Sequence, residues 1–303
     1  MAIPVGPDYA DIDGNGTIDF DALRKAGARF VSIQGVYGRP ANGQSPVYRD
    51  AVWKRDAPSA RRAGLKVAPY LFLCVPNKGR VTPDPEVQVD AFADYCAGDL
   101  QRDVDWAPFF DVEEASDKLS SQDYYAWIVR AYVRLMERFG CVPNMYTSGR
   151  VWGEYLKHHA PGPLLHCALW LAKPWPWLDR TPVHMDGAPA YSPILIPEWG
   201  TQWFLYQYQG DARGWAGHLF QADASRFRVF GKGAKGNHVI WAQERLRASV
   251  APELKVDGDF GAQTLDAVMR LQQLHQLYPD GFIGPETFAP LCWIIPAGAV
   301  VGS

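Results

Sequence analysis

The chain has 303 residues, of which 48% are hydrophobic and 21% are charged, and its formal net charge is −3. This length suits one large domain plus a small one, or two mid-sized domains, and the apolar fraction excludes general disorder. The nearly balanced charge disfavours nucleic-acid binding through a basic surface. Twelve Trp and fourteen Tyr residues either fill the core or form stacking platforms for sugar rings.

The sequence shows no export signal and no membrane segment. The residues after Met1 form neither a basic region nor an apolar one, so we expect synthesis in the cytoplasm without a signal peptide. Any export would then need another route. The apolar tail 293–301 is interrupted by Pro296 and is too short to span a bilayer. Five cysteines without a C-x-x-C pair are expected to be buried free thiols: Cys74, Cys96, Cys141, Cys167 and Cys292.

Apolar strand-like runs alternate with helical stretches over the first two thirds of the chain. The strand candidates are residues 30–36, 67–73, 108–112, 142–147, 167–172 and 203–209. A helix is predicted over 121–139, where Ser120 can cap the first turn and Gly140 can end the last one. Repeated strand–helix units with continuous apolar strands predict a parallel sheet covered by helices. The expected fold class is α/β, with an irregular β/α barrel of the TIM-barrel type over residues 1–230.

Residues 173–200 are rich in Pro and Trp and indicate a long loop at the mouth of the barrel.

The sequence contains no motif for a dinucleotide site, a zinc peptidase site or a serine hydrolase site. No G-x-G-x-x-G follows an early strand, and neither H-E-x-x-H nor G-x-S-x-G occurs. Residues 11–19 imitate a calcium loop, but its twelfth position is Ala22 instead of Glu, so we expect a tight turn and a helix capped by Asp19. The sequence therefore predicts no metal and no organic cofactor.

The last part of the chain contains an internal repeat. Residues 257–264 and 280–287 share the frame D-G-x-(F/I)-G-x-x-T, which joins an Asp-Gly turn to the start of a helix. The glycine-rich residues 231–237 indicate a linker. We therefore expect a small all-helical domain over 238–303. We expect this domain to tether the protein to an insoluble substrate, and the alternative is a structural cap that the barrel needs to fold.

The sharpest indication of chemistry is an apolar strand that ends in carboxylates, F-F-D-V-E-E at residues 109–114. Asp111 and Glu113 are two residues apart, so they share one face at the carboxyl end of the strand, where barrel enzymes keep their active sites. Two close carboxyls do not ionise independently, and one that retains its proton can act as a general acid in glycosidic cleavage. The alternative is the start of a solvated acidic loop.

Residues 1 to about 230 resemble glycoside hydrolase family 25, the Chalaropsis-type lysozymes. The fragments that match in order are 6–8 (GPD), 16–20 (GTIDF), 63–72 (AGLKVAPYLF), 108–113 (PFFDVE), 143–147 (PNMYT), 169–172 (LWLA), 206–208 (YQY) and 221–223 (QAD). Residues 236–291 resemble the peptidoglycan-binding domain often found on wall hydrolases, through the doubled D-G-x-(F/I)-G-x-x-T frame. Together these resemblances imply an enzyme that cuts the glycan strands of peptidoglycan.

The resemblance also implies site residues. Glu113 would be the general acid, and Asp111 would orient or electrostatically support the reacting sugar. Asp8 and Asp223 would complete the acidic floor of the cleft. The candidates for sugar contacts, each with buried packing as the alternative, are Tyr70, Tyr146, Trp170 and Gln207.

The chain departs from the family pattern in three places. Residues 34–38 (QGVYG) replace the family's K-A-T-E-G, and residues 223–225 (DAS) replace its D-x-N. The segment after Asp8 is longer than usual, which leaves Asp11 or Asp13 as alternatives for the acid of the first strand. These changes concern the contacts to sugar subsites more than the D-x-E pair.

The resemblance implies a muramidase that cleaves between N-acetylmuramic acid and N-acetylglucosamine. The absence of a signal peptide would suit a phage endolysin that is released by a holin. It would also suit an antibacterial toxin that a secretion machine injects. The rival hypotheses are another wall hydrolase, either a glucosaminidase or an amidase, and a wall-binding protein without activity. We expect a monomer whose partner is peptidoglycan, with no nucleic acid and no membrane among its partners.

Overall fold

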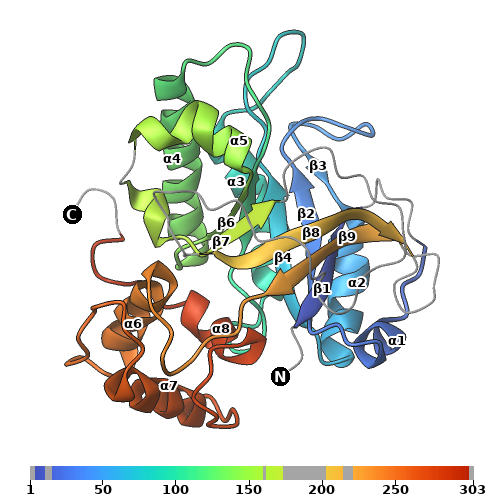
Figure 1. Ribbon diagram of the computed structural model, residues 1–303. Coiled ribbons are helices and arrows are strands. Elements are labelled where there is room, and N and C mark those ends of the chain that lie inside the picture. Colours follow the sequence, from blue (N-terminus) through green and yellow to red (C-terminus); the bar gives the residue numbers. More distant parts are fainter. Residues whose placement is uncertain (1–3, 11–15, 160–161, 173–202, 214–220, 300–303) are drawn as a thin grey trace.

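The computed structural model describes residues 4–10, 16–159, 162–172, 203–213 and 221–299 (Figure 1). Eight strands form a closed barrel because β1 pairs both with β2 and with β9. These strands are β1 (Val5–Tyr9), β2 (Phe30–Tyr37), β4 (Lys66–Phe72), β5 (Phe109–Val112), β6 (Asn144–Thr147), β7 (Leu169–Ala172), β8 (Trp203–Arg213) and β9 (Gln221–Phe227). The two-residue β3 (Tyr48–Arg49) pairs with the end of β2. The predicted α/β barrel is confirmed.

The expectation of a wholly parallel sheet is wrong for one strand of the barrel. The other barrel strands are parallel to their neighbours, but β9 runs antiparallel between β8 and β1. The short β3, outside the barrel, is also antiparallel to β2. Buried side chains in β9 include Ala222 and Ser225, and the half-buried Asp223 and Arg226 lie between the buried positions. A parallel strand covered on both faces is a continuous apolar run in the sequence. The sequence of β9 mixes polar and apolar residues, so it is not among the predicted strands.

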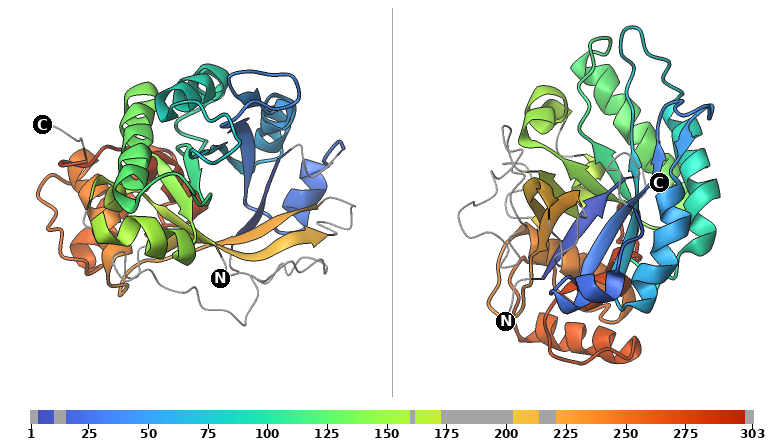
Figure 2. Two further views of the ribbon diagram at one scale, coloured as in Figure 1. Left: turned by 90° about the horizontal axis from the view of Figure 1, so that it is seen from above. Right: turned by 90° about the vertical axis from the view of Figure 1, so that its right-hand side faces the viewer.

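Helices cover one half of the barrel, as the view from above shows (Figure 2). They are α1 (Phe20–Lys25), α2 (Ala51–Arg62), α3 (Pro85–Cys96), α4 (Ser121–Phe139) and the short α5 (Gly149–Val151). The predicted end signals of α4 are confirmed. The Ser120 Oγ accepts from the Asp123 amide at 3.1 Å, and Gly140 ends the helix in the left-handed region with a φ of 63°. None of the described helices is long and apolar enough to cross a membrane.

Two further sequence predictions are confirmed. Asp19 caps α1 by accepting a hydrogen bond from the amide of Ala22 at 2.9 Å. All five cysteines are free and buried. The predicted loop 173–200 lies outside the described residues.

The C-terminal part consists of α6 (Asn237–Ser249), α7 (Ala262–Leu274) and α8 (Pro285–Cys292). A buried glutamine holds each copy of the repeat. Gln243 Nε2 donates to Asp257 and Thr264 of the first copy, at 3.0 and 3.1 Å. Gln272 makes the same two bonds to the Asp and Thr of the second copy, at 2.7 and 3.0 Å. The repeated sequence therefore builds two matching turns, each fixed by one amide.

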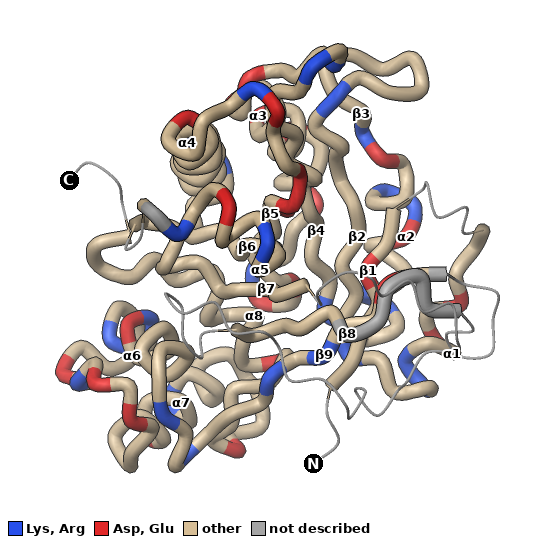
Figure 3. The backbone as a smooth tube through the Cα atoms, turned by 45° about the horizontal axis from the view of Figure 1, so that its top comes forward, with Lys and Arg blue, Asp and Glu red and all other residues tan. Residues whose placement is uncertain are grey.

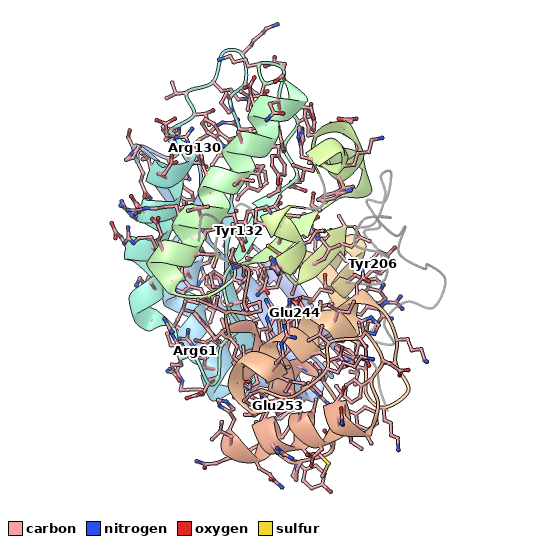
Figure 4. The ribbon with its side chains drawn as sticks, turned by 90° about the vertical axis from the view of Figure 1, so that its left-hand side faces the viewer. Arg61, Arg130, Tyr132, Tyr206, Glu244 and Glu253 are labelled. Atoms are coloured by element: carbon pink, nitrogen blue, oxygen red, sulfur yellow. The ribbon has the colours of Figure 1, made fainter. Side chains whose placement is uncertain are left out.

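The C-terminal helices pack directly on the base of the barrel, the end at which the parallel strands begin (Figures 1 and 4). Phe288 of α8 contacts the rings of Trp106 and Phe227, with centroids 5.2 Å apart in both pairs. The Trp293 indole donates to the carbonyl of Asp105 at 2.9 Å, and the Tyr132 hydroxyl of α4 donates to the carbonyl of Ala299 at 3.0 Å. One hydrophobic core therefore runs through both parts of the chain.

The expected linker is hydrogen-bonded to the first turn of the repeat. The amide of Gly233 donates to the carbonyl of Phe260 at 2.9 Å, and the amide of Gly236 donates to that of Gly258 at 2.8 Å. Phe230, just before this segment, exchanges backbone hydrogen bonds with Ile283. Residues 231–237 thus follow the surface of the small domain closely.

Candidate active site

The carboxyl end of β5 places Asp111 and Glu113 at the mouth of the barrel, where acidic residues (red) lie beside the β5 label in Figure 3. Asp111 stands in register with Phe72 of β4 and Tyr146 of β6, and its exposed fraction is 8%. Glu113 directly follows the strand and is exposed. The Asp111 carboxyl therefore lies in the floor of the site, and the Glu113 carboxyl reaches the solvent above it.

Burial sets the ionisation of Asp111. It raises the pKa of the carboxyl well above the usual range, and the neighbouring carboxylates of Glu113, Asp8 and Asp223 raise it further. Within the described part of the chain, Asp111 Oδ1 is buried and has no hydrogen-bond partner. A protonated carboxyl is therefore favoured at this position, as in other crowded carboxylate sites.

Asp8 and Asp223 lie close enough to Asp111 to raise its pKa. They lie opposite one another in the antiparallel pair of β1 and β9. Gln207 of β8 lies between them, because its Nε2 donates to Asp223 Oδ2 at 2.6 Å and is 3.4 Å from Asp8 Oδ1. The Gln207 Oε1 in turn accepts from the Tyr146 hydroxyl at 2.8 Å. A chain of hydrogen bonds thus runs from β6 through β8 to β9 and β1 across the barrel.

Glu113 is also shifted toward the protonated form. Desolvation by the surrounding protein and the neighbouring Glu114 raise its pKa, while the nearby Tyr146 hydroxyl lowers it in part. A carboxyl that is exposed to substrate and keeps its proton longer than usual suits a general acid.

The aromatic candidates lie beneath or beside the carboxyls. Trp170 has an exposed fraction of 3%, its indole donates to Ser225 Oγ at 3.0 Å, and its ring meets that of Tyr146 edge-on at 5.2 Å. Packing in the barrel interior therefore accounts for Trp170. Tyr70 of β4 is half-buried and stands in register with Phe109 of β5.

The geometry agrees with comparisons to known families. The model of glycosyl hydrolases family 25 matches residues 11–214, about two thirds of the chain. The chain belongs to this family. It is a glycoside hydrolase, and a peptidoglycan-binding domain model matches its residues 235–291. The comparison with curated proteins gives no match.

Solved structures of the family share the barrel. A family 25 lysozyme from Aspergillus fumigatus is 21% identical, with a TM-score of 0.57 over 75% of this chain and 94% of that one. A muramidase from Trichobolus zukalii is 20% identical, with a TM-score of 0.56 over 74% and 93%. The catalytic domain of an endolysin from Listeria monocytogenes bacteriophage P40 is 15% identical, with a TM-score of 0.54 over 75% and 93%. At these identities the likeness concerns the fold.

The family match starts after Asp8 and stops before Asp223, so their place in the site of this family 25 enzyme follows from the geometry of β1 and β9. Asp11 and Asp13, the alternatives for the first-strand acid, lie outside the described residues. Within the described ranges, no group of three or more His, Cys, Asp or Glu side chains is arranged to hold a metal ion.

Sequence reasoning missed the ion pair beside Glu113. Glu114 is only 14% exposed and accepts from both terminal nitrogens of Arg39 at 2.6 Å. It also accepts from the amide of Val75 at 2.9 Å, which ties the exit of β5 to the loops after β2 and β4. The interpretation of Glu114 as part of a solvated loop is therefore wrong. An arginine 75 residues away gives no local signal in the sequence.

The raised pKa of Asp111 predicts an unusual dependence of stability on pH. The folded state binds a proton that the unfolded state has already lost, so stability falls as pH rises from about 4 through the folded pKa. Asp111→Asn removes this loss. We therefore expect the melting temperature of the variant, relative to that of the parent, to rise between pH 4 and pH 7. Each kcal/mol of unfolding free energy that the parent loses over this range corresponds to roughly 2–4 °C.

Thermal unfolding followed by tryptophan fluorescence at several pH values checks this expectation. The matched control is Asp21→Asn, which changes an exposed carboxyl on α1. A difference for Asp111→Asn that stays constant or shrinks between pH 4 and pH 7 would show that this carboxyl is ionised in the folded enzyme.

Proposed function

We propose that this family 25 enzyme is a muramidase, which hydrolyses the β-1,4 bond between N-acetylmuramic acid and N-acetylglucosamine in peptidoglycan. The main observation in favour is the strand-end pair Asp111 and Glu113 above the acidic floor of Asp8 and Asp223. The peptidoglycan-binding domain supports the same polymer as substrate. Two of the similar structures bear the names muramidase and lysozyme.

In the proposed mechanism Glu113 donates its proton to the glycosidic oxygen as the bond to the anomeric carbon breaks. The leaving sugar departs as an alcohol, and positive charge develops on the remaining ring. Water then supplies the hydroxyl group of the anomeric carbon and returns a proton to Glu113, so the acid is restored and a new reducing end is formed. Asp8 and Asp223 lie where carboxylates would stabilise the positive charge, and the protonated Asp111 would orient the sugar by hydrogen bonding. Tyr146 and Gln207 are positioning residues that hold these carboxyls in place.

Analysis of the new chain ends tests the bond that is cut. Purified walls are digested and then reduced with borohydride, and we expect muramitol as the new reduced end. Glucosaminitol would instead identify a glucosaminidase. New free amino groups without new reducing ends would identify an amidase and would contradict the proposed mechanism.

We further propose that the enzyme acts on bacterial walls as an endolysin or a comparable bacteriolytic enzyme, and that it does so as a monomer. The named endolysin among the similar structures motivates this proposal. Sedimentation at the concentration used for wall digestion, together with clearing of suspended bacteria by added enzyme, tests both parts.

A further inference from the structure

A pocket of about 600 Å³ lies at the base of the barrel, on the side away from the carboxylates. This volume is within the range usual for ligand sites. One wall is formed by Pro4, just before β1, and by the turn between α1 and β2, including Gly27 and Arg29. The second Asp-Gly turn of the C-terminal domain lines the other wall, including Tyr278 and Phe282. The pocket exists because the two parts of the chain pack together.

Two guanidinium groups converge at the barrel wall. Arg24 and Arg29 both donate to the backbone carbonyl of Ala28, at 3.3 and 2.9 Å. Among the described residues, neither arginine has a carboxylate within 4.0 Å. Burial and the charge of Arg24 lower the pKa of Arg29, and the carboxylate of Glu286 offsets this only in part. An anion bound at this wall would compensate both cations.

The acidic residues of the pocket already have partners. Glu286 forms an ion pair with Lys66, with Oε2 and Nζ 2.7 Å apart. Asp280 Oδ1 accepts from Gln272 Nε2 at 2.7 Å and from the amide of Phe282 at 2.9 Å. Arg29 therefore remains as the charged group of the lining that is available to a ligand.

The other wall presents exposed aromatic rings on a fixed turn. The exposed fraction is 84% for Tyr278 and 41% for Phe282, unusual for large apolar side chains in this structure. Gln272 holds the turn from beneath, because its Oε1 accepts from the amide of Gly281 at 2.9 Å. A surface fixed in this way loses little conformational entropy when a ligand binds.

We infer that this pocket binds the stem peptide of peptidoglycan, with a stem carboxylate on Arg29 and the adjoining apolar part of the stem against Tyr278 and Phe282. The inference rests on the proposed function, since it takes the same polymer as ligand. It also assigns part of the wall-binding site to the barrel and not to the peptidoglycan-binding domain alone.

The pocket and the carboxylates lie at opposite ends of the barrel. The seven residues of β4 run from Lys66, which contacts Glu286 at the base, to Phe72, which stands beside Asp111 at the mouth. At about 3.3 Å for each residue this distance is about 20 Å. The stem that is bound therefore does not belong to the disaccharide that is cut, and the pocket anchors the enzyme to a neighbouring part of the wall.

Calorimetric titration of the full chain with two soluble ligands tests the inference. One ligand is a disaccharide–peptide with free stem carboxylates, and the other is the same compound with these carboxylates amidated. We expect the parent to bind the free acid about tenfold more tightly than the amide. Arg29→Gln should bind both forms as weakly as the parent binds the amide, and Arg29→Lys should keep part of the preference.

The matched control is Arg247→Gln, which removes an exposed arginine of α6 outside the pocket lining and should behave like the parent. Tyr278→Ala should weaken both ligands equally by about tenfold. Leu274→Ala, a neighbouring exposed side chain outside the lining, should not weaken either. The melting temperature of each variant shows whether it is folded.

Three outcomes would overturn the inference. In the first, folded Arg29→Gln keeps the full preference for the free acid. In the second, the parent binds neither ligand but still releases muramitol ends from walls, so the proposed function stands without this site. In the third, the parent neither binds nor cleaves, and the proposed function fails as well.

Discussion

Glu113→Gln should lower the rate of peptidoglycan hydrolysis by about two to four powers of ten. The amide keeps the size of the side chain but has no proton to give to the leaving oxygen. Stability should hardly change, because desolvation and Glu114 already disfavour the ionised form of this carboxyl in the folded enzyme. A large loss of rate with an unchanged melting temperature is therefore the expected combination.

Release of reducing ends from purified walls measures the rate, and thermal unfolding measures the stability. Glu137→Gln is the matched control, because its side chain is 55% exposed on α4, outside the described site. Near-normal hydrolysis by Glu113→Gln would remove Glu113 from the role of general acid. A melting temperature well below that of the parent would attribute the lost rate to the fold and not to the missing proton.

Phe288→Ala should lower the free energy of unfolding by about 3–5 kcal/mol, the cost typical of truncating a fully buried Phe. The Phe288 ring is 0% exposed and lies between barrel side chains such as Trp106 and Phe204 and the Trp241 ring of α6. Because this one side chain joins both parts of the core, its loss should destabilise the barrel and the C-terminal helices together. We expect a single unfolding transition that moves as a whole to lower temperature.

Differential scanning calorimetry measures this transition, with Tyr278→Ala as the control that truncates an exposed ring of the same domain.

A fragment of residues 1–231 should be insoluble, since removal of α8 uncovers the apolar base of the barrel. This result would support the cap over the separable tether. Two transitions, of which only one responds to Phe288→Ala, would instead show that the barrel folds independently and that the C-terminal domain is a tether.

The sequence by itself determined the elements and the type of site. Runs of buried apolar residues locate six strands of the barrel, because strands covered on both faces have to be apolar throughout. The abrupt change from Phe110 to Asp111 and Glu113 marks the end of a strand, and the geometry of parallel barrels then places the carboxyls at the mouth. The doubled D-G-x-(F/I)-G-x-x-T frame predicts two equal turns, and the structure contains both.

The tertiary structure alone decided which distant residues meet. Asp223 lies opposite Asp8 because β9 closes the barrel in the antiparallel sense, a pairing that no local pattern reveals. Glu114 loses its solvent because Arg39 reaches it from another loop. Leu274 at the end of α7 is 67% exposed, whereas Leu271, about one turn earlier, is fully buried. Burial and ion pairing depend on neighbours far along the chain, whereas helix caps, turns and apolar periods depend on residues close in sequence.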